Sequence, residues 1–384
     1  MESDRRSFLS AGAAALGCAA WSGAARGRQP GGRSYRAAVI GVTGDGGYGH
    51  GYETVFRGLP NVSLEAIADV QPEGLRAAAE RAGAKRQYLD YREMLAKEKP
   101  DLVCVATRSP NYHRQMALAA IEVGAHLIIE KPLAETLEDA DAIVKAADAS
   151  GRKIAMCHPM RFSSDLRRIK WLIEEGFLGT PVEVRGIGAQ DGRYGGEDMF
   201  VLGTHEFDLM RFYFGDPLWC QASVTVGGRD ITREDVRRAH EPFLTAGDSL
   251  RAAYGFPGNL VYYWSSVKTP DHWRSRRGFT LFGSQRIIAC LSSPPRYYDS
   301  PQVPGPDDQG AWRPLPPPQK SIPVPGGGFA GNLIHAIETD TQPLSSGHDG
   351  RWAVEMVAAA YQSQRTRARV DFPLQERRNP LKLL

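Results

Sequence analysis

The residues that could carry out chemistry stand at two places in the chain. The first is Lys131, which follows Glu130 at the end of the apolar run 125–129 and precedes Pro132. Such a run predicts a buried parallel strand, and ligands bind just beyond the carboxyl ends of these strands. A lysine there can donate a hydrogen bond to a substrate oxygen and stabilise negative charge on it. The alternative is an ordinary surface lysine at a strand end.

The second place is the segment 194–214, in which apolar residues recur at helical spacing. His205 and Asp208 are three residues apart there, on neighbouring faces of one turn. Imidazole accepts protons near neutral pH, so His205 is the candidate base for a substrate hydroxyl, and Asp208 could orient its ring. The alternative is a capping or core histidine. We predict Lys131, His205 and Asp208 as catalytic residues.

A glycine-rich turn upstream predicts a dinucleotide site. The apolar strand 35–40 runs into this turn, whose candidate phosphate-binding residues are Gly41, Gly44, Gly46 and Gly49. Glycine is needed because the backbone turns tightly and approaches a pyrophosphate closely, while the N-terminus of the following helix offers N–H groups. The G-x-G-x-x-G spacing starts at Gly44, whereas Gly41 directly ends the strand, so the register is open.

A second strand, 62–68, ends on Asp69, about 20 residues after the glycines, where an acid accepts hydrogen bonds from ribose hydroxyls. Its charge repels a 2′-phosphate, so we predict NAD rather than NADP. Strands continue to alternate with helices, which predicts βαβ units and a parallel sheet. Residues 34–156 are therefore expected to form a Rossmann domain with these further elements: helix 72–82, strand 102–106, helix 112–123, strand 125–129, helix 137–149 and strand 153–156.

Residues 157–384 are predicted to form a second α/β domain. After a helix at 165–175, strands are expected, several in hairpin order, at 181–186, 249–256, 259–266, 278–282 and 286–291. The proline-dense segment 293–325 is too long for an ordinary connection, so it forms either a functional arm over the site or a strap between subunits. We favour a segment ordered on the surface without a catalytic role. The cysteines show no C-x-x-C or paired His/Cys spacing, so we predict neither a metal site nor a disulfide framework.

Four features, in this order, carry a resemblance to a known family: the glycine turn, Val105-Ala106-Thr107 with Pro110-Asn111-Tyr112-His113, Glu130-Lys131-Pro132-Leu133, and Gly203-Thr204-His205-Glu206-Phe207-Asp208. Through them the chain is similar to the Gfo/Idh/MocA oxidoreductases, which include inositol dehydrogenases and glucose-fructose oxidoreductase. The stretch 346–350 before a helix at 351–364 also resembles the ending of that family.

The resemblance implies a Rossmann domain followed by an α/β domain with a large, mostly antiparallel open sheet. It implies sugars, polyols or their derivatives as substrates, and a homo-oligomer formed through the C-terminal sheet. Beside the glycines, the positions that correspond to the cofactor-binding residues of the family are Asp69, Thr107, Asn111, His113, Glu130 and Lys131.

The chain departs from the family pattern at one position. The family has an aspartate four residues before the histidine, where this chain has Val201. That carboxylate helps to bind the reacting hydroxyl in the family, so its loss puts simple alcohol oxidation in doubt. Other groups could replace it or support the site, with structural roles as the alternative: Glu197, Asp198 and Tyr194 near the helix, and His158 and Arg161 at the domain junction.

The N-terminus predicts export. Asp4-Arg5-Arg6-Ser7-Phe8-Leu9 followed by the uncharged run 10–20 resembles a twin-arginine signal, with a disordered basic tail as the alternative. We expect residues 1–33 to lie outside the fold and the protein to be periplasmic or secreted. The run is too short for a stable membrane span. Cys18 could carry a lipid, but Ala15 stands where a leucine is preferred, so we favour an unanchored protein.

The net charge and the predicted export signal together narrow the range of possible functions. The formal net charge is +3 over 384 residues, which gives no basic surface for nucleic acid. The twin-arginine route carries folded proteins, so a cofactor loaded in the cytoplasm could be retained. We therefore expect an exported oxidoreductase that transfers a hydride to or from a sugar or polyol with retained NAD. The alternatives are a redox-neutral glycosidase or epimerase on the same scaffold, and a non-catalytic, NAD-holding sugar-binding protein.

Overall fold

The computed structural model describes residues 33–188, 192–239, 243–268, 277–291, 294–302, 312–318 and 322–384. Ser34–Leu384 form one compact unit. Arg5, Arg6 and Cys18, and with them the export signal, lie outside the described residues, as do parts of the proline-dense segment. Among the helices of the described ranges, none is both long and apolar enough to cross a membrane.

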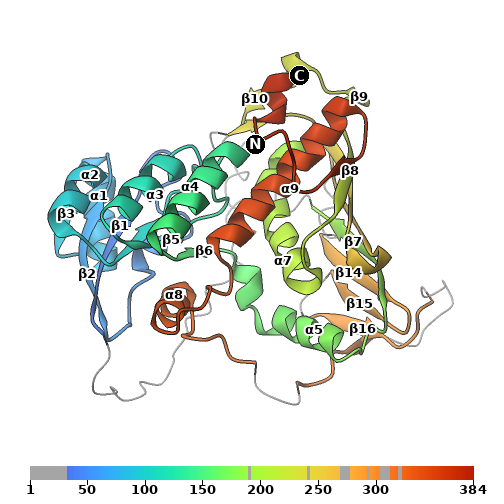
Figure 1. Cartoon of the computed structure of the whole chain (residues 1–384), viewed down its shortest axis with the longest axis horizontal. Helices are drawn as coiled ribbons and strands as arrows, with labels where there is room; N and C mark the ends of the chain where they lie inside the picture. Colours follow the sequence, from blue (N-terminus) through green and yellow to red (C-terminus); the bar gives the residue numbers. More distant parts are fainter. Residues whose placement is uncertain are drawn as a thin grey trace, which may run out of the picture. The chain divides into compact units, whose positions relative to one another are not determined.

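The first sheet is parallel throughout its described strands, as predicted. They are β1 (Tyr35–Ile40), β2 (Val62–Ala68), β3 (Arg86–Tyr88), β4 (Leu102–Val105), β5 (His126–Ile129) and β6 (Ile154–Met156). Their order is β3-β2-β1-β4-β5-β6. Figure 1 labels β1, β2, β3, β5 and β6 of this sheet. The chain changes direction across the sheet between β1 and β4, which makes the carboxyl ends of these two strands the switch point where such sheets bind ligands.

Helices cover both faces of this sheet: α1 (Pro72–Ala82), α2 (Tyr91–Glu98), α3 (His113–Glu122) and α4 (Leu137–Ser150). The sequence patterns predicted α1, α3 and α4 to within two residues. They missed β3 and α2, because both are short and largely exposed on one side, with no apolar run to mark them. The Thr136 side chain caps α4 by accepting from the Asp139 N–H.

The helix predicted directly after the glycine turn is not formed. Only a single 3-10 turn, η1 (Tyr52–Thr54), follows β1 before β2 begins. The reason is local, because the turn holds left-handed glycines that an α-helix cannot contain: Gly44, Gly46, Gly47, Gly49 and Gly51. A dinucleotide would therefore meet the N–H groups of a glycine loop rather than the end of a full helix.

The second sheet is large and mostly antiparallel, as predicted. Its strands in the described residues are β7 (Pro181–Ile187), β8 (Trp219–Val226), β9 (Arg229–Asp230), β12 (Ser249–Gly255), β13 (Val261–Val267), β14 (Gly278–Gly283), β15 (Ile287–Cys290), β16 (Arg296–Tyr298), β17 (Trp312–Pro314) and β18 (Val370–Asp371). The order is β17-β16-β15-β14-β7-β13-β12-β8-β18, with β9 beside β8. Only the β13–β7 pair is parallel among these described pairs. A separate short pair joins β10 (Arg237–Arg238) and β11 (Leu244–Thr245).

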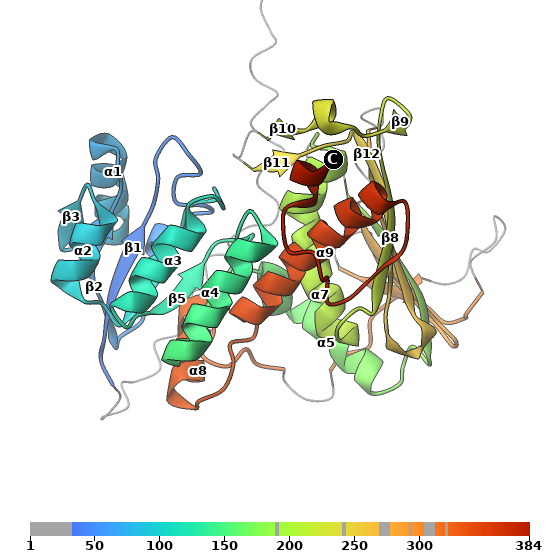
Figure 2. The same cartoon turned by 45° about the horizontal axis from the view of Figure 1, so that its top comes forward.

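The remaining helices lie after β6 and among these strands: η2 (Pro159–Phe162), α5 (Ser164–Glu174), α6 (Gly195–Asp198), the π-helix η3 (Met199–Gly203), η4 (Arg233–Asp235), η5 (Pro257–Asn259), α7 (Thr204–Phe214), α8 (Phe329–Glu338), α9 (Gly347–Thr366) and η7 (Pro380–Leu383). Helix α9 contacts α4, α7 and β8, and Figure 2 shows α7 and α9 between the first-sheet helices and the larger sheet. One hydrophobic core runs through this layer, and a second lies under α1 and α8.

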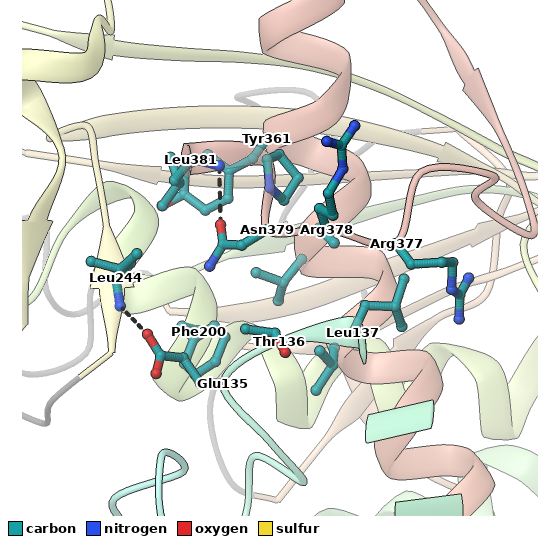
Figure 3. A pocket seen from close by; sticks show the side chains of 14 residues that line it. Glu135, Thr136, Leu137, Phe200, Leu244, Tyr361, Arg377, Arg378, Asn379 and Leu381 are labelled. Carbon is teal, nitrogen blue, oxygen red and sulfur yellow. Dashed lines mark hydrogen bonds between the residues drawn. The ribbon is translucent and has the colours of Figure 1, made fainter. Parts of the chain in front are cut away.

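The C-terminal segment fixes α4 to α9. Arg377 donates to the Asp141 carboxylate on α4 at 2.6 Å and to the Glu355 carboxylate on α9 at 2.8 Å. Arg351 bridges the same two acids. Nearby, α4, α9 and the segment before η7 enclose a cavity of about 20 Å³, enough for one water (Figure 3). The layer that carries α7 is thus held against the first sheet by paired charges as well as by apolar packing.

Candidate active site

The glycine turn lies directly against the end of β4. A Cβ on Gly46 would come within 2.5 Å of the Thr107 hydroxyl oxygen, and one on Gly49 within 2.6 Å of the Ala106 carbonyl oxygen. Both glycines have positive φ. Only glycine therefore fits at either position, and the turn presents backbone at the switch point between β1 and β4.

Two other predicted glycines have different surroundings. The ring of Tyr48 lies over Gly41, where an added Cβ would be 2.3 Å from the ring. Gly41 therefore leaves room for the buried ring of Tyr48. Gly44 has open space around its Cα and a positive φ, which places it at the exposed tip of the turn. The backbone at Gly44 and Gly46 is therefore better placed for a phosphate than that at Gly41.

Asp45, between those glycines, ties the turn to the loop after β4. The Thr107 hydroxyl donates to the Asp45 carbonyl at 2.8 Å, and the Ser109 hydroxyl donates to the Asp45 carboxylate. Thr107, a predicted cofactor-binding residue, thus has a structural partner in this conformation. A carboxylate also stands in the loop that would face a pyrophosphate.

Asp69 lies at the end of β2, at the predicted position, but its oxygens already have donors. The Thr43 N–H and hydroxyl reach the carboxylate at 3.0 and 2.7 Å, and the Gln71 N–H reaches it at 2.9 Å. The residue is only 2% exposed. A ribose hydroxyl would take the place of Thr43 as donor. The glycine cradle and this buried acceptor fit a dinucleotide, and the residues that would hold it are Gly44, Gly46 and Asp69.

Glu130 and His113 tie the loops of the site together. The fully buried Glu130 carboxylate accepts from the Lys131 N–H at 2.6 Å and pairs with Nδ1 of His50 at 2.8 Å, which links β5 to the glycine turn. The buried His113 ring lies 2.8 Å from the Thr107 carbonyl oxygen and 2.9 Å from that of Pro132. Asn111 is exposed at the start of α3.

Lys131 reaches from the first sheet to the second part of the chain. Its side chain is buried, 2% exposed, and Nζ donates to the Val201 carbonyl oxygen at 3.3 Å. Val201 lies in the π-helix η3, a form of helix that is frequent at functional sites. The position that lost its family carboxylate therefore still contacts the lysine, through its backbone.

His205 lies at the start of α7, one turn beyond Val201. Its ring is partly buried, and Nδ1 is shielded from solvent without a hydrogen-bond partner. Burial, reinforced by the positive charge of Lys131, holds the pKa of His205 well below its usual value. The imidazole is therefore neutral near pH 7, the form that can accept a proton.

Asp208 was predicted to orient His205, but its hydrogen bonds go elsewhere. Its Oδ2 accepts from Nε of Arg161 at 2.7 Å, while Oδ1 lies 3.2 Å from Nδ1 of His158 and 3.3 Å from the Ser345 hydroxyl. Burial alone would raise the pKa of Asp208, but the charge of Arg161 and the hydrogen bonds from Arg161 and the His158 ring outweigh it and hold that pKa well below its usual range. Asp208 is an ionised partner of His158 rather than of His205.

The other acids near the helix have their own surroundings. Glu197 pairs with Arg237 at 2.7 Å, toward the surface, and Tyr194 precedes α6. Asp198 is fully buried beside Gly188. Burial raises the pKa of Glu206 to about 8, against the effect of a hydrogen bond from Tyr262, so this acid is largely protonated at neutral pH.

The fold thus gathers Lys131, the Val201 carbonyl and His205, with His158 and Asp208 behind them. Sequence reasoning named His158 only as a secondary candidate, and it missed His50 and Ser345. The sequence could have identified His158, because this residue lies just beyond the carboxyl end of the strand β6. Ser345 has none, since it reaches the site only through folding.

Comparison with known proteins places the chain by sequence and by fold. Residues 35–158 match the family described as "Oxidoreductase family, NAD-binding Rossmann fold" (GFO_IDH_MocA). The chain is 30% identical over 250 residues to D-apiose dehydrogenase of Paraburkholderia graminis, covering 60% of this chain and 65% of that protein. It is 26% identical to myo-inositol 2-dehydrogenase of Thermotoga maritima, covering 59% and 72% respectively. The alignment thus spans about two thirds of these relatives.

Among solved structures, levoglucosan dehydrogenase in complex with NADH and levoglucosan superposes with a TM-score of 0.71 at 21% identity, over 89% of this chain and 100% of that one. This likeness concerns the fold. The class that these comparisons define concerns the first domain: residues 35–158 are similar to the NAD-binding Rossmann domain of the Gfo/Idh/MocA oxidoreductases.

The neutral state of His205 predicts a pH dependence of stability. The unfolded chain protonates this imidazole below about pH 6.5, whereas the folded protein does not, so the unfolded state binds more protons and stability falls as the pH falls. His205→Asn should make this loss shallower by up to about 1.4 kcal/mol per pH unit below about pH 6.5. The free energy of unfolding of both proteins is measured by urea unfolding from about pH 5 to 8, and the difference between them near pH 8 serves as the reference. Parallel curves for the two proteins would contradict the buried neutral imidazole.

Proposed function

We propose that this protein is an oxidoreductase that transfers a hydride between a nicotinamide dinucleotide and a CH–OH group of a sugar or polyol. The observation that carries the proposal is the buried ammonium of Lys131, which follows β5 and contacts the Val201 carbonyl one helical turn before the neutral imidazole of His205. Oxidation of a hydroxyl needs such a pair, one group to bind the oxygen and one to take its proton.

The roles follow from the surroundings of each group. Nζ of Lys131 donates to the reacting oxygen and stabilises negative charge that develops on it. His205 takes the hydroxyl proton at Nε2, because Nδ1 is the nitrogen turned away from solvent. Glu130 keeps the glycine turn in register with Lys131. A bound nicotinamide would supply the acceptor or donor of the hydride.

The named relatives support the substrate class. They are dehydrogenases of D-apiose and myo-inositol, and the similar structure holds levoglucosan. Which compound this chain uses depends on its own pocket. The missing carboxylate at Val201 favours, as a second candidate, a redox-neutral cycle in which the same hydroxyl is oxidised and later restored, as in a glycosidase or epimerase. A non-catalytic sugar-binding protein is the third.

For the cofactor we propose NAD, because the buried charge of Asp69 would oppose a 2′-phosphate. We further propose export through Arg5 and Arg6 with the dinucleotide retained. Retention is supported by the closed contacts around the site, in which Asp45 and Glu130 join the glycine turn to the ends of β4 and β5.

We also propose that a second copy packs on the outer face of the large sheet. Ile187 on β7 is 36% exposed and Tyr263 on the neighbouring β13 is 47% exposed, in a shallow depression that Arg185 and Arg251 also line. Sedimentation velocity should give a dimer or larger for the wild type and a monomer for Tyr263→Glu. A wild-type monomer would contradict the proposal.

Catalysis is tested by paired substitutions. Lys131→Met and His205→Asn should each lower turnover about a hundredfold or more, the scale of a lost oxyanion or acid–base partner, with bound dinucleotide unchanged. Lys145→Met, an exposed lysine on α4, is the matched control. Val201→Asp restores the family carboxylate and should raise plain dehydrogenase activity, whereas Val201→Thr keeps the shape and should not. The assay follows reduced nicotinamide over a panel of sugars and polyols.

The outcomes separate the candidates. Reduction of bound dinucleotide by a sugar means hydride transfer, and glycoside cleavage without net reduction means the redox-neutral cycle. If the dinucleotide-loaded wild type shows neither of these activities, the protein is a binding protein. Full turnover in His205→Asn would exclude this imidazole as the base.

Export and cofactor are tested together. Protein collected outside the cytoplasm should release about one NAD(H) per chain on acid quenching, and little NADP(H). Arg5→Lys combined with Arg6→Lys should confine the precursor to the cytoplasm, while Arg26→Lys with Arg28→Lys, of equal charge, should not. Exported protein without dinucleotide would contradict retention, and export of the Arg5 and Arg6 variant would contradict the twin-arginine route.

A further inference from the structure

Two neighbouring imidazoles each carry a buried nitrogen without a hydrogen-bond partner. These atoms are Nδ1 of His205 and Nε2 of His158. The two rings pack edge to face, with 5.8 Å between centroids and 75° between planes. Buried polar atoms in folded proteins nearly always have partners, so two such atoms on adjacent rings call for a common explanation.

The other nitrogen of His158 is firmly held. Nδ1 lies 2.9 Å from the Ser345 hydroxyl and 3.2 Å from Oδ1 of Asp208. The Ser345 hydroxyl can accept from that N–H while it donates to Oδ1 of Asp208, 3.3 Å away. Because Asp208 is ionised it can only accept, so the proton of a neutral His158 belongs on Nδ1 and its lone pair on Nε2.

We propose that His158, fixed by Asp208 and Ser345, is a positioning residue that receives a proton from His205. This proposal rests on the proposed function of His205. When His205 takes the hydroxyl proton at Nε2, it passes its Nδ1 proton to Nε2 of His158 after a small movement of the two rings, because these two nitrogens are not hydrogen-bonded to each other in this structure. His158 then carries the positive charge next to the Asp208 carboxylate, and His205 is again neutral. The reverse transfers return the proton to the oxygen.

This arrangement supplies one thing that a carboxylate at Val201 would supply, namely a place for the positive charge that develops on His205. His158 and Asp208 are both fully buried, so a proton held there is out of contact with solvent. A proton kept inside the site can return to the same oxygen, which suits a cycle that oxidises a hydroxyl and then restores it. The inference therefore specifies the residues that such a cycle would use.

The cluster contains charges that hold Asp208 ionised while the proton moves. Arg161 on η2 binds its other oxygen and also Asp349 at the start of α9. Lys131 acts on His205 from the side of the first sheet. Its positive charge disfavours a lasting charge on His205 itself, which directs the proton toward the ring that has a carboxylate beside it.

The first test reads the tautomer of His158 without any turnover. In protein labelled with ¹⁵N-histidine, NMR near pH 8 should show His158 protonated at Nδ1 and bare at Nε2, its signals identified by their loss in His158→Gln. Ser345→Ala, which keeps the Arg161–Asp208 pair, should retain this tautomer, and Asp208→Asn should lower its population. His158 protonated at Nε2 in the wild type would overturn the proposal.

The second test is kinetic. His158→Gln, which can bind Asp208 but cannot be protonated, should lower kcat about tenfold or more with KM and bound dinucleotide unchanged. Combined with His205→Asn it should cost little beyond His205→Asn alone, because the two rings act as a unit. His126→Asn is the matched control, a buried histidine at the opposite end of β5 whose Nδ1 accepts from the Lys153 N–H.

The outcomes distinguish this proposal from the function on which it rests. Unchanged kcat in His158→Gln, or a loss confined to KM and dinucleotide content, would overturn the relay while leaving hydride transfer in place. An inactive, loaded wild type would contradict the proposed function, and the tautomer then decides alone: Nδ1–H that depends on Asp208 supports the dyad, and Nε2–H rejects it.

Discussion

The geometry of the site depends on one buried guanidinium. Arg161, on the turn that directly follows the last strand of the first sheet, donates to the Asp208 carboxylate and carbonyl, to the Leu344 carbonyl and to Asp349. A charge that is 5% exposed is tolerated only when such partners are all present. Because these acceptors come from α7, from the loop before α9 and from α9 itself, satisfying Arg161 fixes α7 relative to β6 and its neighbour β5.

Once α7 is fixed in this way, Lys131 meets the π-helix that precedes it. The wider turn of η3 brings the Val201 carbonyl to 3.3 Å from Nζ, so the ammonium is anchored by backbone in a place where the family uses a side chain. A backbone carbonyl accepts a hydrogen bond but carries no charge. Burial of His205, reinforced by the positive charge of Lys131, lowers the pKa of that imidazole.

The sequence was informative for residues whose place is set by a single strand or helix. The apolar run predicted a strand that ends just before Lys131, and the helical spacing predicted a helix at His205. Both elements are formed, while the catalytic roles of the two residues stay predictions. The glycine pattern predicted the turn but not the loss of its helix, because several left-handed glycines in succession outweigh the tendency of a Rossmann unit to continue as an α-helix. The hydrogen-bond partner of Asp208 was predicted wrongly, because helical spacing places its carboxylate near His205 but does not decide which neighbouring group it binds. Its partners Arg161 and Ser345 are 47 and 137 residues away in the chain.

Those distant partners change what the loss of an acid at Val201 means. A carboxylate there would touch both the lysine and the substrate, and would leave less positive charge around His205. Without it, the negative charge lies farther from the surface, on the buried Asp208. One oxygen of that carboxylate, Oδ2, already accepts a hydrogen bond from Arg161. The remaining oxygen, Oδ1, acts through His158 and Ser345 rather than on the substrate. In the function that we propose, an imidazole with Lys131 on one side and the His158–Asp208 pair on the other is better suited to holding a proton briefly than to releasing it into solvent.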